Sequence, residues 1–192
     1  MQKPINAITV YAASSCKIDE TYIDAARELG RLLAKRSITC VYGGGPNGLM
    51  GAVADAALDS GGQVCGVIPQ FMIDRGWINR RLTETVVTEG MHERKRIMAE
   101  RSDALIALPG GIGTLEELFE AMAWRQLGLI TKPLVVINTG GFYDSLFDLL
   151  QKISDENFMR HENSELFSVA KTPEEALEII DFQLANPIKP LE

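Results

Sequence analysis

The chain has 192 residues, of which 46% are hydrophobic and 23% are charged, and its formal net charge at pH 7 is −7. A chain of this length buries enough surface for one globular domain, so we expect a single domain over residues 1–192. The negative charge excludes a general affinity for nucleic acid, because contacts to phosphate require a basic face.

The N-terminal residues and the cysteines indicate where the protein works. The run from Met1 to Ala7 has no apolar signal core, and no later stretch is apolar over the length that a bilayer requires. The cysteines Cys16, Cys40 and Cys65 are odd in number and lack C-x-x-C spacing, which is typical of reduced thiols. We therefore expect a cytoplasmic protein that binds no membrane.

Short β-rich runs alternate with amphipathic helical patterns along the whole chain. The expected strands are residues 7–12, 38–42, 64–68, 85–87, 104–108, 133–138 and 167–170. The expected helices are residues 19–35, 49–58, 91–101, 114–126 and 143–153, followed by one that begins after Pro173. Right-handed crossovers between such units predict a doubly wound, mostly parallel sheet in a three-layer α/β/α sandwich, with any ligand at the carboxyl ends of the strands.

Residues 70–81 do not fit this alternation. Phe71, Met72 and Trp77 are mixed with charged residues without a dominant period, and Pro69 ends the strand that precedes them. We interpret this segment as a loop or a lid.

The first of two glycine-rich loops is Gly43-Gly44-Gly45-Pro46-Asn47-Gly48, between a strand and a helix. It satisfies the G-x-G-x-x-G pattern of dinucleotide-binding folds, but the following strand ends in Val67-Ile68-Pro69 and lacks their ribose-binding acid. Leu49 and Met50 stand where a P-loop needs Lys and Ser or Thr, which excludes that motif. A tight turn would explain one glycine, whereas three in a row indicate the close approach of a ligand.

The second loop, Pro109-Gly110-Gly111-Ile112-Gly113-Thr114-Leu115-Glu116-Glu117, also joins a strand to a helix. Its backbone N–H groups and the helix dipole would face an anion, so we interpret it as a phosphate cradle. The structural alternative is that Thr114 and Glu117 form a capping box. Two carboxylates beside a phosphate cradle lie where a ribose would sit, and they suit an oxocarbenium-like transition state, which favours a catalytic role.

Basic residues cluster in the middle of the chain despite its net negative charge. They are Arg75, Arg80, Arg81, Arg94, Lys95, Arg96 and Arg101. The helix of Arg94 and Lys95 precedes the strand that leads into the second loop, so we expect its start near the same end of the sheet. For Arg96 and Arg101 a solvent-exposed basic face is the simpler interpretation.

Three blocks together, residues 43–51, Met91-His92-Glu93-Arg94-Lys95 and residues 109–117, resemble the Lonely Guy (LOG) family of cytokinin-activating phosphoribohydrolases, often labelled lysine decarboxylases. The similarity continues through residues 124–128 and 140–143. The resemblance implies a Rossmann-like fold and hydrolysis of a nucleoside 5′-monophosphate, N6-modified AMP or AMP, to free base and ribose 5-phosphate. It also implies a homodimer, whose interface could use apolar residues of the helix at 118–127 if these are not part of the core.

By motif, Arg94 and Glu117 correspond to the catalytic arginine and glutamate of the family. Glu117 would stabilise positive charge at the ribose and orient or deprotonate the attacking water, while Arg94 would anchor the ligand. The residues at substrate-binding positions are Ser14, Gly44, Gly45, Met91, Lys95, Gly110, Gly111, Gly113, Thr114 and Glu116. The chain departs from the family at Ala13, at Ala123 and in segment 70–81, which we expect over the base, so the resemblance does not fix the base.

Two other functions remain open. A nucleosidase with broad specificity for purine and pyrimidine monophosphates would use the same residues. A non-catalytic carrier of a phosphorylated pterin would need the glycine loop but not Arg94 with Glu117, so this pair favours an enzyme. We expect no organic cofactor, and the two histidines, His92 and His161, give little support to a metal site.

Overall fold

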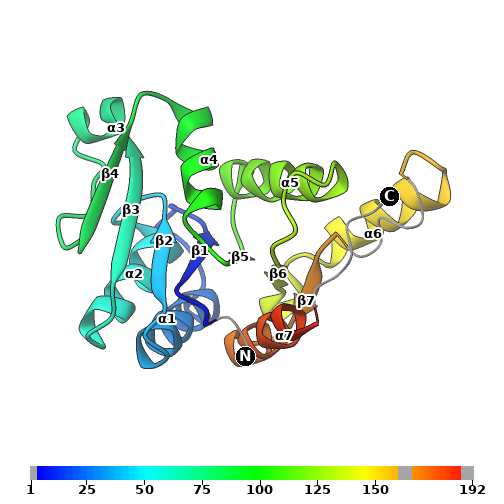
Figure 1. The fold of residues 1–192 in the computed structure, drawn as a ribbon, viewed down its shortest axis with the longest axis horizontal. Coiled ribbons are helices and arrows are strands. Elements are labelled where there is room, and N and C mark those ends of the chain that lie inside the picture. Colours follow the sequence, from blue (N-terminus) through cyan, green and yellow to red (C-terminus); the bar gives the residue numbers. More distant parts are fainter. Residues whose placement is uncertain (1–3, 160–165, 187–192) are drawn as a thin grey trace.

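The computed structural model describes residues 4–159 and 166–186. Its sheet has seven parallel strands in the order β4-β3-β2-β1-β5-β6-β7 (Figure 1). The strands are β1 Ala7–Tyr11, β2 Thr39–Tyr42, β3 Val64–Pro69, β4 Glu84–Thr88, β5 Ala104–Ala107, β6 Leu134–Ile137 and β7 Ser168–Ala170. The strand order reverses between β1 and β5, which is the topological switch point where such sheets bind ligands.

Helices cover both faces of this sheet, as the sequence predicts. They are α1 Glu20–Lys35, α2 Gly48–Asp59, α3 Gln70–Asp74, α4 Met91–Glu100, α5 Ile112–Gln126, α6 Asp144–Asp155 and α7 Pro173–Ala185, with a 3₁₀ turn, η1, at Thr139–Gly141. The helices α1, α2 and α7 pack on one face, whereas α4, α5 and α6 pack on the other (Figure 1). The predicted three-layer sandwich is therefore confirmed.

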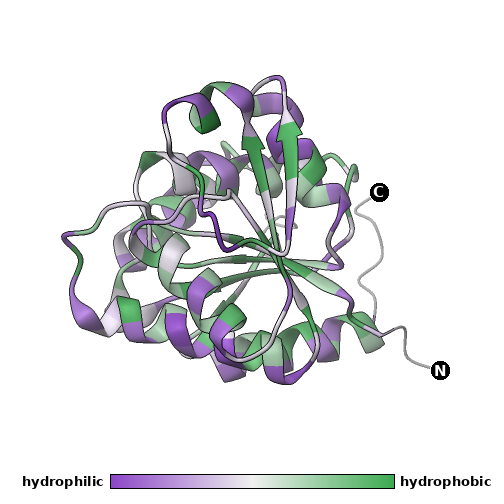
Figure 2. Cartoon of the chain, turned by 90° about the vertical axis from the view of Figure 1, so that its left-hand side faces the viewer, coloured by the Kyte–Doolittle hydropathy of each residue, from purple (hydrophilic) through white to green (hydrophobic). Residues whose placement is uncertain are grey.

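Successive side chains of each strand point to opposite faces of the sheet, so the strands contribute to the hydrophobic cores on both faces. In β1, Ile8 and Val10 belong to the hydrophobic cluster under α1, α2 and α7, whereas Ala7 and Tyr11 belong to the cluster under α4, α5 and α6. Figure 2 shows the strands as hydrophobic ribbons inside the molecule and the hydrophilic stretches on its outer helices. The sheet is thus a packed scaffold, and its carboxyl ends carry the glycine-rich loops.

One local prediction is wrong, and one structural alternative is excluded. Gln70–Asp74 forms α3 rather than irregular structure, because a helix of five residues with none buried is too short to show a helical period in the sequence. Helix α5 begins at Ile112, with Gly111 as its N-cap residue. Because the N-cap position is occupied by Gly111, Thr114 lies inside the first turn of α5. It therefore cannot be the N-cap residue of a capping box with Glu117.

Within residues 4–159 and 166–186, no helix is long and apolar enough to span a membrane. In the same ranges, no group of three or more His, Cys, Asp and Glu side chains could hold a metal ion. His161 lies outside the described residues. Cys16, Cys40 and Cys65 are free thiols, the first exposed and the other two buried.

Candidate active site

A cavity of about 560 Å³ lies at the carboxyl ends of the central strands, beside the switch point. It is lined by the loops that follow β1, β2 and β5, by the start of α4 and by part of segment 70–81. Both glycine-rich loops therefore contribute to one cavity. The substrate-binding candidates that line it are Ser14, Gly45, Met91, Gly111, Gly113, Thr114 and Glu116.

Arg94 brings a buried positive charge into this cavity. Its Nε donates a hydrogen bond to the carbonyl oxygen of Val67 at 3.1 Å, and its Nη2 donates to that of Gly43 at 3.3 Å. Val67 belongs to β3 and Gly43 follows β2, so the guanidinium bridges two neighbouring strand ends. Among the described residues that line the cavity, Arg94 is the only cation.

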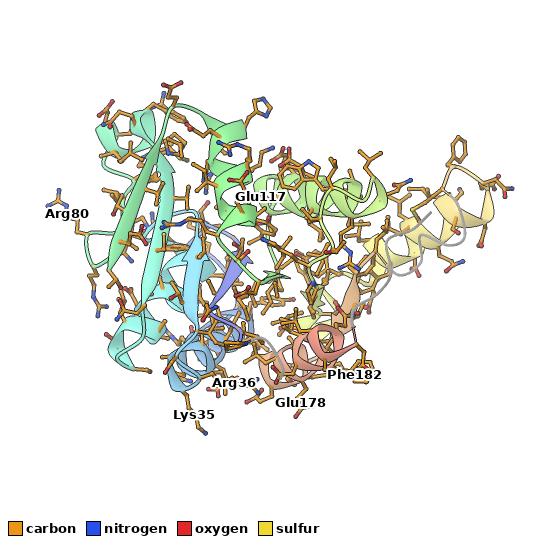
Figure 3. All side chains as sticks on the ribbon, viewed as in Figure 1. Lys35, Arg36, Arg80, Glu117, Glu178 and Phe182 are labelled. Carbon is orange, nitrogen blue, oxygen red and sulfur yellow. The ribbon has the colours of Figure 1, made fainter. Side chains whose placement is uncertain are left out.

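Glu117 supplies a buried carboxylate next to this guanidinium. Figure 3 shows its side chain near the junction of α4 and α5, and its Oε1 lies 3.9 Å from Nη2 of Arg94. At that distance the two groups attract each other without a direct hydrogen bond, so the carboxylate can still accept one from a ligand or water. Burial raises the pKa of Glu117 to about 7, against the lowering effect of Arg94. A carboxyl group with such a pKa can exchange a proton near neutral pH.

The N-terminus of α5 opens into the cavity. Gly111, Ile112, Gly113 and Thr114 all line it, and no side chain in the described part of the protein caps this helix. The first backbone N–H groups of α5 and the positive end of its dipole are therefore available to an anion. This geometry fits the interpretation of the loop as a phosphate cradle.

Lys95 has two carboxylate partners and is not among the described residues that line the cavity. Its Nζ donates to Oε1 of Glu116 and, at 3.1 Å, to Oε1 of Glu120. Burial alone would lower the pKa of Lys95, but these hydrogen bonds raise it. Because Glu116 does line the cavity, Lys95 can act on the site by holding Glu116. Glu120 is absent from the residues predicted for the site, although it lies one helical turn after Glu116.

Two further candidates support the loops without lining the cavity. Gly44 has a φ of +77° and packs against Ile68, which explains why this position requires a glycine. Gly110 packs against Thr114, whose Oγ1 would lie 2.2 Å from a Cβ atom at position 110. Both glycines therefore shape the backbone from which neighbouring residues reach the cavity.

The other basic residues do not converge on the site. Arg81 pairs with Asp55 and Asp59 on α2. Figure 3 shows Arg80 pointing away from the ribbon at the side of the molecule formed by β4. On α4 and after it, exposed pairs join Arg96 to Glu100 and Arg101 to Glu84, in agreement with the interpretation of a solvent-exposed face.

Tyr11 is a neighbour of the carboxylates that the sequence does not predict. This buried residue ends β1, and burial together with the negative charge of Glu117 raises the pKa of its hydroxyl. Segment 70–81 is expected over the base, and two of its residues, Met72 and Trp77, line the cavity. In the sequence, only their positions could have marked these two aromatic residues as part of the site. Tyr11 ends a buried strand, and Trp77 lies in a segment without helical period.

A family model described as possible lysine decarboxylase matches residues 50–180. The cytokinin riboside 5′-monophosphate phosphoribohydrolase LOG of Oryza sativa subsp. japonica is 44% identical over 168 residues, which cover 88% of this chain and 69% of that protein. LOG5 of Arabidopsis thaliana, which has the same descriptive name, is 40% identical over 174 residues, or 91% of this chain and 76% of that protein. The chain belongs to the LOG family.

Solved structures share the fold of this LOG family chain. The molybdenum cofactor carrier protein of Chlamydomonas reinhardtii superposes with a TM-score of 0.71 at 25% identity, covering 94% of this chain and 99% of that one. The molybdenum cofactor binding protein of Rippkaea orientalis gives a TM-score of 0.71 at 23% identity, covering 92% and 96%. The predicted Rossmann-like fold is confirmed. None of the described residues that line the cavity is a lysine, so the site does not fit the description lysine decarboxylase.

Gly43 illustrates how the first loop of this LOG family protein serves the site. A Cβ atom at position 43 would lie 1.8 Å from Nη2 of Arg94, so only glycine admits the guanidinium. We expect Gly43→Ala to lower kcat/KM roughly 10- to 100-fold, because it displaces Arg94 by about an ångström or more. Gly90→Ser is the control, since, apart from its chain neighbours, no described atom lies within 4 Å of a Cβ atom there. Equal kcat/KM values for both variants would contradict this role of Gly43.

Lys95 and Arg96 allow a matched comparison on one helix. We expect Lys95→Met to reduce the free energy of unfolding by about 1–3 kcal/mol, because it leaves two carboxylates without their buried counter-ion. Arg96→Met removes an exposed pair with Glu100 and should change that free energy by no more than about 0.5 kcal/mol. Urea unfolding of both variants measures the difference. Similar small changes in both would show that Lys95 is not the counter-ion that the structure indicates.

Proposed function

We propose that this protein, as one phosphoribohydrolase domain over residues 1–192, hydrolyses the N-glycosidic bond of a nucleoside 5′-monophosphate. The substrates are N6-modified AMP or AMP, and the products are free base and ribose 5-phosphate. The observation that supports this most directly is the buried Glu117 carboxylate, 3.9 Å from the Arg94 guanidinium, in a cavity that the N-terminus of α5 also lines. Membership of the LOG family supports the same reaction, because its curated relatives are named for it.

The geometry suggests where each part of the nucleotide binds. The phosphate would accept hydrogen bonds from the first backbone N–H groups of α5, where the helix dipole also favours negative charge. The ribose would then lie beside Glu117, which is in the second turn of the same helix. A nucleoside without phosphate would forgo the contacts at α5, so we expect the monophosphate to be the preferred form.

Cleavage requires an attacking water and a carboxylate. As the bond from C1′ to the base nitrogen breaks, its electron pair leaves with the base, which takes up a proton from solvent, and positive charge develops on the ribose. The ionised Glu117 would stabilise that charge and accept a proton from water as the water oxygen bonds to C1′. Arg94 would anchor ligand oxygens and keep Glu117 more ionised than burial alone would allow.

Product analysis tests the proposal directly. Purified protein is incubated with AMP, its N6-isopentenyl derivative, CMP and the matching nucleosides, and the bases are separated by chromatography, with Glu117→Gln as the blank. Release of base from monophosphates but not from nucleosides is the expected result. Comparable release from AMP and CMP would favour a broad nucleosidase. No release, combined with stoichiometric binding of a phosphorylated pterin, would favour a carrier.

The proposal includes a homodimer in the cytoplasm. Helix α5 exposes Ile112 and Phe119, and its C-cap residue Leu127 is exposed too, although Leu118 of the helix belongs to the core. Large exposed apolar residues on a helix that lines the candidate site are typical of a protein interface, and a second copy could cover them. Sedimentation at micromolar concentration tests the dimer, which a monomeric mass would rule out. The free thiols suit a reducing compartment.

A further inference from the structure

Part of the cavity lining is apolar, and we call it the apolar wall. Its members are Met50, Ile68, Met72, Trp77 and Met91. None of these side chains is a carboxylate, an amide or a hydroxyl, so the wall offers a ligand mainly contact area and one aromatic ring. Such a surface distinguishes ligands by size and stacking rather than by their pattern of hydrogen-bonding groups.

Trp77 and the Glu117 carboxylate reach the cavity from different strand ends, whereas Met91 of the same wall lies beside Arg94, with its Sδ 3.6 Å from Nη1. Ile68 belongs to β3, and Met72 and Trp77 follow it, whereas Glu117 lies on the helix that follows β5. The strands β2 and β1 stand between β3 and β5, which separates these strand ends by roughly 14 Å at about 4.8 Å per strand. If the phosphate binds at the N-terminus of α5 and the ribose lies beside Glu117, the base extends towards the end of β3.

Trp77 is the aromatic member of the wall, and 48% of it is exposed. The guanidinium carbon of Arg75 lies 5.1 Å from the centre of the Trp77 ring and 5.5 Å from that of Phe71, so it braces the indole through cation–π contacts. The backbone N–H of Trp77 donates to Met72 at 3.0 Å, and that of the buried Asn79 donates to Gly44 at 2.8 Å. The indole is therefore fixed relative to the first glycine-rich loop.

We infer that the Trp77 indole stacks on the base of the nucleotide and supplies much of the preference for AMP over CMP. This inference rests on the proposed function and adds to it a residue that determines specificity. A purine offers the indole more area than a pyrimidine does, and the wall presents no strong hydrogen-bonding side chain to favour one base edge over another.

Substitution of Trp77 tests the inference through KM. We expect Trp77→Ala to raise KM for AMP about 5- to 100-fold, which is the effect of losing one stacked base, with kcat changed much less. The preference for AMP over CMP should fall in the same variant, and Trp77→Phe should restore most of it. Phe182→Ala removes an exposed aromatic side chain of α7 and is the matched control.

Fluorescence gives a measurement that does not depend on turnover. The chain has two tryptophans, and Trp124 is not among the described residues that line the cavity. Trp124→Phe combined with Glu117→Gln leaves Trp77 as the reporter and prevents hydrolysis during titration with AMP. We expect a saturable change in its emission. Trp77→Phe with Glu117→Gln should show no such change, because its remaining indole lies elsewhere.

The outcomes separate this inference from the proposed function. Hydrolysis by the unsubstituted protein, with unchanged Trp77 emission and unchanged KM in Trp77→Ala, would overturn the role of Trp77 alone. An unchanged preference for AMP over CMP in Trp77→Ala would do the same. Absence of both AMP hydrolysis and AMP binding, measured by calorimetry on the unsubstituted protein, would overturn the proposed function and the inference with it.

Discussion

Glu117→Gln is expected to lower kcat about 100- to 10,000-fold, which is the contribution typical of a positioned acid–base group. The amide has nearly the shape of the carboxylate, so packing around α5 is retained. It can neither accept a proton from water nor carry the negative charge that stabilises a cationic ribose. Initial rates of base release measure kcat, and circular dichroism with thermal unfolding shows whether the fold is intact.

A carboxylate on a neighbouring helix serves as the control for this variant. Glu100→Gln changes an exposed residue of α4 whose partner is Arg96, and we expect its kcat to stay within about twofold of the unsubstituted protein. If Glu117→Gln retained near-normal kcat with an intact fold, the catalytic assignment of Glu117 would have to be abandoned.

The same variant should reveal the cost of ionising Glu117 in the folded protein. The pKa of Glu117 is about 7 in the fold against 4.5 ordinarily, so between these values the folded state holds a proton that the unfolded state has released. Stability attributable to this carboxyl therefore falls as pH rises through that window, by about 3 kcal/mol in total. Relative to the unsubstituted protein, Glu117→Gln should gain free energy of unfolding between about pH 5 and about pH 8.

Much of this fold follows from local sequence patterns. Alternating strand and helix periods give the order of elements, and the two glycine-rich loops fall between strands and helices as predicted. The sequence also predicts that the motifs of Arg94 and Glu117 belong to one site, because right-handed crossovers between parallel strands bring both motifs to the same end of the sheet. Helix α3 could not be predicted, since five residues, none of them buried, carry too little periodic signal.

The roles of single residues depend on contacts between distant positions, which the sequence does not express. Gly43 is a glycine because Arg94, 51 residues later, passes over it. The three consecutive glycines predict the close approach of a ligand to the first loop. At Gly43, the group that approaches is instead the guanidinium of Arg94. Lys95 was predicted to contact the nucleotide, but only the packing of α4 on α5 shows that Glu116 and Glu120 hold it.

The second large effect is expected from Arg94→Met, which should lower kcat/KM about 100- to 1,000-fold, because the ligand loses its charged anchor and Glu117 loses the positive charge that keeps it ionised. Methionine keeps an unbranched chain of similar length but leaves the carbonyl oxygens of Val67 and Gly43 without their donor. Arg94→Lys should recover part of the loss, because it restores the charge without the planar fork.

The pH profile separates this electrostatic role of Arg94 from simple damage to the fold. If the ionised form of Glu117 is the active one, kcat/KM rises with pH and reaches half its plateau near the pKa of about 7. Arg94 lowers that pKa, so its removal should move the rise to higher pH, whereas Arg96→Met should leave the profile in place. A lower plateau with no displacement would mean that Arg94 acts on the ligand alone. Displacement towards lower pH would show that Arg94 does not stabilise the ionised form of Glu117.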